Sequence, residues 1–331
     1  MTTTGEPATA RRKTPSEPGK QRAPQRPADV IFSSSARAAG VLILVILAAV
    51  AAFLVVQAWP AIQTPSDELA ERMHWAADIT SLLDYVGPLV FGTVLAAVIA
   101  LVIATPIAIG VALFISHYAP RRLAQGLGYV IDLLAAIPSV VYGLWGALWL
   151  MPQVFPIFVW LSEHVGFIPI FEGPASGPPR TILTAGIVLA VMILPIITAV
   201  SREVFLQTPT LHQEAALALG ATRWEMVRLA VLPFSRSGVI SASMLGLGRA
   251  LGETMAVAMI LSPGFLYSFF ILQAGQQQNI AANIALEFPE SSGVGVNVLI
   301  FTGLVLFVIT LAVNMLARWI VSRRAEFSGA N

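Results

Sequence analysis

The sequence predicts an all-α, polytopic membrane protein with six transmembrane helices. Hydrophobic residues make up 56% of the 331 residues and charged residues only 11%, whereas a soluble domain carries about 25% charged residues. The charges are also segregated, because they lie mainly in short segments between long apolar runs. This pattern is typical of a chain that places most of its length in the hydrocarbon of a bilayer.

Six apolar segments have the length that a helix needs to cross the membrane, which is about 20 residues for ~30 Å of hydrocarbon. We predict them at Ala38–Trp59, Pro88–Ser116, Leu127–Leu150, Thr181–Val200, Gly238–Leu261 and Val296–Ala317. Residues 1–36 are polar and cannot bury enough apolar surface to fold, so we expect a disordered tail there. The membrane domain is expected to occupy residues 37–325.

The distribution of Lys and Arg predicts the orientation of the chain. If the N-terminus is cytoplasmic and there are six spans, nearly all of the 19 basic residues fall in inner segments. Only Arg72 and Arg180 fall in outer segments. Because basic residues accumulate on the cytoplasmic side of membrane proteins, we expect both termini to be cytoplasmic. Of the outer segments, residues 61–85 are expected to form a short amphipathic segment at the outer surface and Pro152–Pro179 an irregular loop.

Several kinds of chemistry are excluded by the sequence. The chain has no cysteine and only four histidines, which are scattered singly without metal-ligand spacing. It lacks the Gly-Lys-Ser/Thr sequence of a Walker-type phosphate loop. No span groups residues in a catalytic arrangement. We therefore expect a non-enzymatic chain with no cofactor, no metal and no nucleic-acid partner, and any ATP and Mg²⁺ would be used by a separate subunit.

The inner segment at residues 201–236 is predicted to form a helix, a turn and a second helix. The first helix carries Glu214-Ala215-Ala216, whose small side chains would let another surface approach closely. Gly220 is expected to end it in a left-handed conformation. Thr222 is a candidate cap for the second helix, and Pro233 is expected to end that helix before the fifth span. By composition alone, an ordinary connecting loop would read in the same way.

Arg249 and Glu253 place two opposite charges inside the predicted fifth span. In one continuous helix, residues four apart project from the same face, so we expect an ion pair. Charges in hydrocarbon are costly unless they are paired or line a polar cavity. The pair is therefore a candidate substrate path, with a purely structural ion pair as the alternative. The rigid fork of Arg249 suits an oxyanion, because it can donate two hydrogen bonds to it.

The third predicted span contains a break at Pro138. Proline removes a backbone hydrogen bond and exposes polar groups, which a cavity tolerates better than lipid does. Ser139 and Tyr142 follow it and would add hydroxyl groups to a path, although a simple packing kink explains the proline equally well. Asp132 lies nearer the inner face, where we expect a structural role.

The motifs described above resemble sequence runs found in two protein families. The run Glu214-Ala215-Ala216-x-x-x-Gly220 through Leu232-Pro233 resembles the EAA signature of binding-protein-dependent ABC importer permeases. That resemblance implies the ABC importer permease fold and a loop that docks on an ATPase. The runs Ile137-Pro138-Ser139-Val140-Val141-Tyr142-Gly143 and Arg249-Ala250-Leu251-Gly252-Glu253-Thr254-Met255-Ala256 resemble the PstC family of phosphate permeases.

The resemblance to the PstC family implies a function and a set of partners. A member would be a permease subunit in the bacterial inner membrane that carries phosphate inward. It would pair with a PstA-like subunit, a dimer of PstB-like ATPases and an external PstS-like phosphate-binding protein. In that family the arginine and glutamate of the second run, here Arg249 and Glu253, are regarded as important for phosphate passage. A permease for sulfate, molybdate or tungstate, or an ion-coupled secondary carrier, remains an alternative.

Overall fold

The computed structural model describes residues 27–65, 68–69, 75 and 81–325, and most of these residues are helical. The helices are α1 Pro27–Gln63, α3 Leu82–Leu113, α4 Arg121–Ala135, α5 Ser139–Trp145, α6 Met151–His164, α7 Ile182–Leu206, α8 Thr210–Ala218, α9 Arg223–Met226, α10 Leu232–Leu251, α11 Met255–Ile260, α12 Ile280–Glu287 and α13 Val294–Ala325. Short π-helical turns join α5 to α6 and α9 to α10. The predicted all-α class is confirmed.

Within the described residues, six helical segments are long and apolar enough to cross a membrane, as the sequence predicted. They are Ile31–Gln63, Leu82–Tyr118, Ser139–His164, Ile182–Leu206, Arg223–Leu251 and Val294–Ile320. Residues 27–51 of the first helix form a unit of their own, which is apolar around its whole circumference from Ala38 onward. Because α1 begins at Pro27, residues 27–36 are helical and do not belong to the expected tail. Residues 1–26 and much of the predicted outer surface segment lie outside the described residues.

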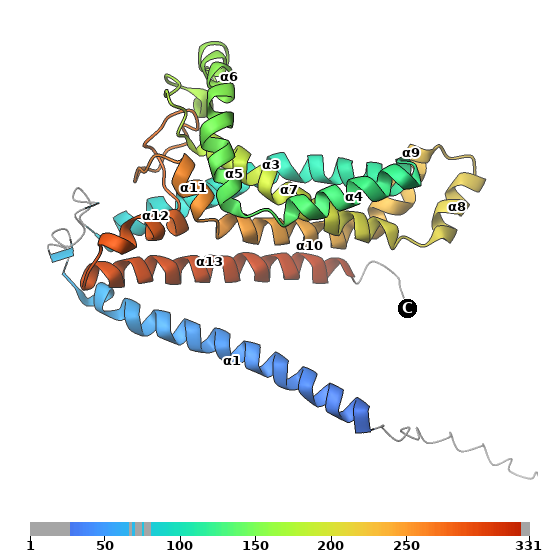
Figure 1. Ribbon diagram of the computed structural model, residues 1–331, viewed down its shortest axis with the longest axis horizontal. Helices are drawn as coiled ribbons and strands as arrows, with labels where there is room; N and C mark the ends of the chain where they lie inside the picture. The colour runs from blue at the N-terminus through green and yellow to red at the C-terminus, as the bar shows by residue number, and fades with distance from the viewer. Residues whose placement is uncertain (1–26, 66–67, 70–74, 76–80, 326–331) are drawn as a thin grey trace, which may run out of the picture. The chain divides into compact units, whose positions relative to one another are not determined.

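The second unit is built around the packing of α3 against α7. A row of alanines with a spacing of four residues is fully buried along α3, and small residues allow two membrane helices to approach closely. The row is Ala96, Ala100, Ala104, Ala108 and Ala112. On α7, Gly186 lies so near α3 that an added Cβ would come within 2.4 Å of Ile99 Cγ2. α10 packs on both helices, and α13 packs on α10 (Figure 1).

The third span differs from its predicted limits. α4 ends at Ala135, and the long apolar helix runs from Ser139 to His164 instead of ending at Leu150. The expectation of an irregular loop from Pro152 onward is therefore wrong for residues 152–164. Pro152 falls in the first turn of α6 after a π-helical turn, where a missing N–H costs little. Pro138 does break the chain between α4 and α5, as predicted.

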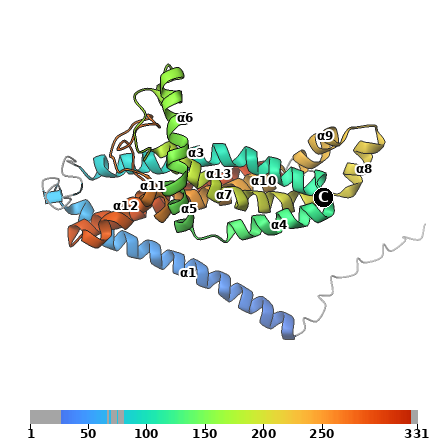
Figure 2. The same cartoon turned by 45° about the horizontal axis from the view of Figure 1, so that its top comes forward.

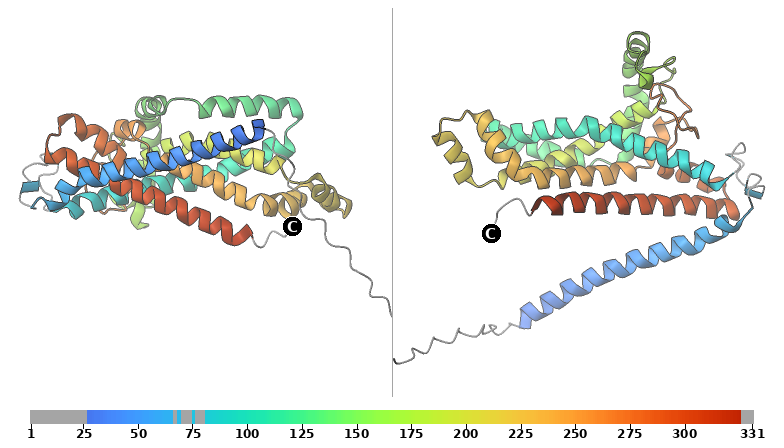
Figure 3. Two further views of the ribbon diagram at one scale, coloured as in Figure 1. Left: turned by 90° about the horizontal axis from the view of Figure 1, so that it is seen from below. Right: turned by 180° about the vertical axis from the view of Figure 1, so that it is seen from behind.

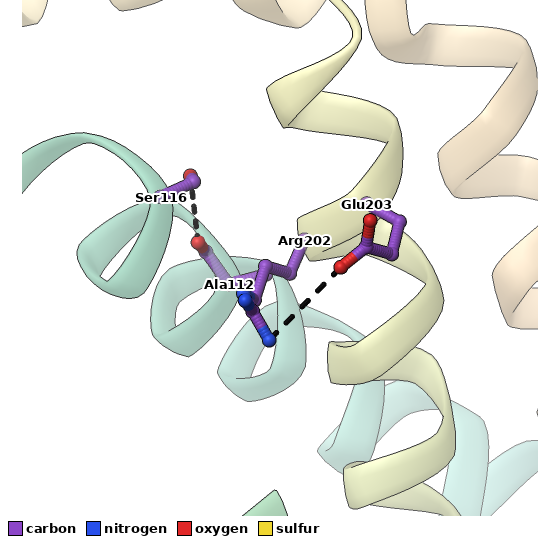
Figure 4. A network of polar contacts seen from close by, with 4 residues as sticks. All are labelled: Ala112, Ser116, Arg202 and Glu203. Atoms are coloured by element: carbon purple, nitrogen blue, oxygen red, sulfur yellow. Dashed lines mark hydrogen bonds and ion pairs between the residues drawn. The ribbon is translucent and has the colours of Figure 1, made fainter. Parts of the chain in front are cut away.

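α4 is amphipathic and packs along α7 (Figure 2). Its Gly128 faces Arg202 of α7, and an added Cβ would lie 2.7 Å from Arg202 Nη1. Figure 4 shows Arg202 beside Glu203, with their charged atoms 4.0 Å apart. Both side chains are partly exposed, so this ion pair contributes little by itself. At Gly128 the guanidinium of Arg202 thus fills the space that a side chain on α4 would occupy.

The two ends of this unit carry different structures. α8 and α9 lie at one end, and α11 and α12 lie toward the other (Figures 1 and 3). At the α12 end, residues 261–279 form an extended segment that exchanges backbone hydrogen bonds with residues 170–183. This arrangement agrees with a coupling loop on one membrane face and irregular loops on the other.

Candidate functional site

Arg249 lines a cavity of about 770 Å³ between α7, α10 and α13. Its lining is mostly apolar, with four polar or charged side chains among the residues. The lining residues are Ile196, Ser241, Met244, Leu245, Gly248, Arg249, Asn314, Ala317 and Arg318. None of them is acidic. A cavity with apolar walls and only positive charge attracts anions strongly, because the walls screen the charge poorly.

The position of Arg249 explains how its charge is tolerated. It lies in the last turn of α10, where the carbonyl groups at the helix end carry partial negative charge. Its side chain is exposed and forms no ion pair within 4.0 Å with any described residue. The charge of Arg249 is therefore not neutralised by a described carboxylate.

The predicted ion pair between Arg249 and Glu253 is not formed. α10 ends at Leu251, and Gly252 to Thr254 are non-helical before α11 begins at Met255. The helical spacing that would bring the two side chains together is therefore lost between them. Glu253 is instead buried, at 7% exposure, and its carboxylate accepts a hydrogen bond of 3.1 Å from the backbone N–H of Ala256. It holds the first turn of α11.

The residues around Pro138 have separate positions. Tyr142 is buried, and its hydroxyl donates a 2.9 Å hydrogen bond to the carbonyl of Leu134, across the break between α4 and α5. Ser139 is half-buried, and Asp132 is exposed on α4. Of the predicted path residues, Arg249 is the one that lines the cavity. Ser139, Asp132 and Pro138 are not in the lining of the Arg249 cavity.

The loop between α7 and α10 folds as the sequence predicted at two positions. Gly220 has a φ of +87°, the left-handed conformation that glycine adopts most readily. Thr222 caps α9: its hydroxyl accepts the N–H of Glu225, and the Glu225 carboxylate accepts the N–H of Thr222. Glu214 and Ala215 are exposed on α8, and Ala216 is half-buried. The turn between the two short helices is therefore defined by these local contacts.

Pro233 does not end the second helix, which corrects the prediction. The chain continues through the π-helical turn Val227–Val231 into α10, with Pro233 in the first turn of that helix. In the wider turn, the N–H of Leu232 reaches back to the carbonyl of Val227. Proline at the start of a helix lacks an N–H that would not be needed there. The two segments therefore form one continuous helix from Arg223 to Leu251.

The loop presents an apolar surface. Several large hydrophobic side chains of residues 211–234 are exposed, with Leu219 at 90% and Leu211 at 77%. A shallow cavity of about 290 Å³ lies among them, lined by His212, Ala216, Leu229, Ala230 and Phe234. Exposed apolar side chains of this kind are available to pack against another surface.

Comparison with known proteins gives the class of this chain. Residues 104–326 match the family described as "Binding-protein-dependent transport system inner membrane component". In fold, the chain resembles the crystal structure of a bacterial ABC transporter involved in the import of the acidic polysaccharide alginate. The TM-score is 0.51 at 16% identity, over 71% of this chain and 78% of that one. The fold and the family together define a multi-pass inner-membrane permease subunit of an ATP-driven transporter, not its ATPase.

Curated relatives narrow the assignment. The chain is 45% identical to "Phosphate transport system permease protein PstC 2" of Mycobacterium tuberculosis, over 92% of this chain and 94% of that protein. It is 37% identical to "Phosphate transport system permease protein PstC" of Mesorhizobium japonicum, over 91% and 92% of the two chains. The chain belongs to the PstC family of phosphate transport system permease proteins. The resemblance seen in its motifs is thereby confirmed.

Sequence reasoning missed three polar residues of the Arg249 cavity. They are Ser241, Asn314 and Arg318. The available signal was the spacing on each helix: Asn314 and Arg318 are four residues apart, and Ser241 and Arg249 are eight apart. The sequence of a single helix does not indicate that the face of α10 with Ser241 and Arg249 meets the face of α13 with Asn314 and Arg318.

Proposed function

We propose that this chain forms one half of an importer that moves inorganic phosphate into the cytoplasm. The observation that carries the proposal is the acid-free cavity in which Arg249 stands unpaired among the described residues. A guanidinium fork binds a tetrahedral oxyanion through two hydrogen bonds, and the apolar walls strengthen the attraction. The printed names of the relatives favour phosphate among the oxyanions.

The remaining subunits follow from the two surfaces of the chain. A PstA-like permease would complete the path, so that the cavity faces the interface of a heterodimer. The exposed apolar patch around Leu211 and Leu219 would dock on a PstB-like ATPase dimer, which binds ATP and Mg²⁺. A PstS-like phosphate-binding protein would deliver substrate at the opposite face. In this arrangement both termini are cytoplasmic, in agreement with the distribution of basic residues.

Transport would then couple two movements. Closure of the ATPase dimer on ATP would pull on α8 and α9, and the continuous helix Arg223–Leu251 would carry the movement to Arg249. A rigid connection is needed for this, and the capped turn at Thr222 and the unbroken helix supply it. Substrate access would alternate between the two faces as the helix moves.

Uptake of labelled phosphate by the purified complex in proteoliposomes, with ATP enclosed, tests the proposal. We expect ATP-dependent uptake that unlabelled phosphate abolishes and that equimolar sulfate, molybdate or tungstate leaves nearly unchanged. Inhibition by one of these oxyanions with no inhibition by phosphate would assign that oxyanion instead. Uptake driven by an ion gradient without ATP would make the chain a secondary carrier.

A further inference from the structure

A second cationic side chain, Arg318 of α13, lines the same cavity as Arg249. Asn314 precedes it by four residues, so both project from one face of the helix. Both side chains are exposed, and neither makes a hydrogen bond or an ion pair with another residue that the structure describes. Their donor groups are therefore available to a ligand in the cavity.

The two arginines lie at different depths. Ser241 and Arg249 share a face of α10, and a separation of eight residues corresponds to about 12 Å along the helix. Ser241 is the nearer of the two to the end of the bundle that carries α8 and α9. Arg318 lies toward the C-terminal end of α13, which is on the same side (Figure 1). The cavity thus has Arg249 at one end and a group of polar donors nearer the coupling loop.

We propose that Arg318 and Asn314 form a second oxyanion-binding position on the exit side of the path. The inference rests on the proposed function and names residues that the function does not require. A single arginine between apolar walls would hold an anion tightly and release it slowly. When the anion leaves the first arginine, contact with a second cation nearby compensates for the lost interaction, as binding at several sites does in channels. Arg318 supplies the charge, and the Asn314 amide supplies a further donor.

The competing explanation is that Arg318 only anchors α13 at the membrane surface. Long basic side chains at helix ends extend to the headgroups, and the inner face is rich in them. Arg236 provides the matched control, because it is exposed near the start of α10 and is not part of the cavity lining. A probe placed inside the cavity distinguishes the two roles, because loss of a cavity charge changes the reactivity of the probe and loss of a surface anchor does not.

The absence of cysteine from the chain allows such a probe. Ser241→Cys would place a single thiol in the cavity of the assembled transporter, in inside-out membrane vesicles. The rate of thiol modification is measured with an anionic and with a cationic methanethiosulfonate reagent. The thiols that remain unmodified are then labelled with a second reagent, and the label on this chain is read on a gel. We expect the anionic reagent to react about 10-fold faster, since a basic cavity concentrates anions. Phosphate added to the vesicles should slow that reaction.

The role of Arg318 is then read from the double variants. Ser241→Cys with Arg318→Gln should lose most of the anion preference, because only the more distant Arg249 then remains in the cavity, and phosphate should protect the thiol only at a concentration at least about 10-fold higher. With Arg318→Lys the preference should remain, and with Arg236→Gln both properties should remain. Asn314→Ala should weaken the protection and keep the preference. If Arg318→Gln changes neither the preference nor the phosphate concentration needed for protection, the second position is not there, and Arg318 is a surface anchor.

A parallel uptake measurement separates this inference from the proposed function. Should proteoliposomes with enclosed ATP take up another oxyanion instead of phosphate, and should that oxyanion protect the thiol introduced by Ser241→Cys in an Arg318-dependent way, the assignment to phosphate fails and the second position stands. Should phosphate be imported but fail to protect the thiol, the proposed function stands and the second position is refuted.

Discussion

The carboxylate of Glu253 accepts the backbone N–H of Ala256 at 3.1 Å, so it closes the first turn of α11 where α10 has just ended. The side chain is buried at 7% exposure. This contact gives a carboxylate inside a membrane protein a structural reason to be present. It also separates the role of Glu253 from that of Arg249, which the sequence had joined.

Replacement of Glu253 should distinguish its hydrogen bond from its charge. Glu253→Ala removes the acceptor for the Ala256 N–H, and loss of such a cap costs about 1 kcal/mol. Glu253→Gln keeps a side-chain oxygen at the same place, so its thermal unfolding should stay near that of the unchanged complex. If the Gln variant is destabilised as much as the Ala variant, the negative charge and not the hydrogen bond holds α11.

Two glycines of α3 give a matched pair for testing how closely the extended segment packs on this helix. A Cβ at Gly92 would lie 2.2 Å from the carbonyl oxygen of Gln278, whereas a Cβ at Gly110 would meet no atom within 4 Å. We expect Gly92→Ala to lower the free energy of unfolding by about 1–3 kcal/mol, the usual cost of overpacking. The next residue, Thr93, accepts the N–H of Ile280 at 2.9 Å, so α12 should be displaced as well.

Gly110→Ala is the control, and it should stabilise α3 by up to about 1 kcal/mol through helix propensity alone. Both variants are compared by thermal unfolding of the detergent-solubilised complex. Equal stability of the two would mean that residues 277–278 do not approach α3 as the structure places them.

Much of the fold could be predicted because composition and spacing decide it. The span count follows from apolar runs that have no stable place except the bilayer, and the turn at Gly220 and Thr222 follows from local backbone chemistry. The helix breaks were harder. Pro138 interrupts the chain and Pro152 does not, because a π-helical turn before Pro152 places it at a helix start. A π-helical turn also precedes Pro233, where the sequence had predicted a helix end.

The site was only half predictable for a similar reason. Arg249 stood out as a charge within an apolar run, and its place in a cavity agrees with that interpretation. The predicted pairing with Glu253 required an unbroken helix through Gly252. No local sequence pattern indicated that the helix would end there. Arg318 resembles any basic residue at the end of a span. Only the packing of α13 against α10 brings it to the cavity.

Gly220 should be essential for coupling and not for insertion. Its φ of +87° is unfavourable for residues with a Cβ, by about 1–2 kcal/mol, and the space around it is empty. Gly220→Val should therefore distort the α8–α9 turn without any steric clash elsewhere. We expect normal amounts of the chain in the membrane, with ATP hydrolysis that no longer drives phosphate uptake.

Gly220→Asn serves as the comparison, because asparagine tolerates the left-handed conformation better than other residues with a side chain. It should retain most of the coupled uptake. A Val variant with full uptake and full substrate-stimulated ATP hydrolysis would show that α8 and α9 do not transmit the movement.

Arg249 should be required for uptake and dispensable for folding. The loss of one member of a buried ion pair costs about 3–5 kcal/mol, because the other charge remains uncompensated. No described carboxylate lies within 4.0 Å of Arg249, so Arg249→Gln leaves no such charge behind. We expect its thermal unfolding to change by less than about 0.5 kcal/mol. Phosphate uptake should nevertheless fall by at least about 10-fold, because the cavity loses the fork that binds the oxyanion.

Two variants complete the test of Arg249. Arg249→Lys keeps the charge but not the two-pronged geometry, so its uptake should fall between that of the Gln variant and that of the unchanged transporter. Arg236→Gln removes a positive charge from the same helix outside the cavity, and it should leave uptake and unfolding unchanged. If Arg249→Gln is as unstable as a broken ion pair, Arg249 has an acidic partner in the assembled complex. If it is stable and transports phosphate at the normal rate, the cavity is not the path.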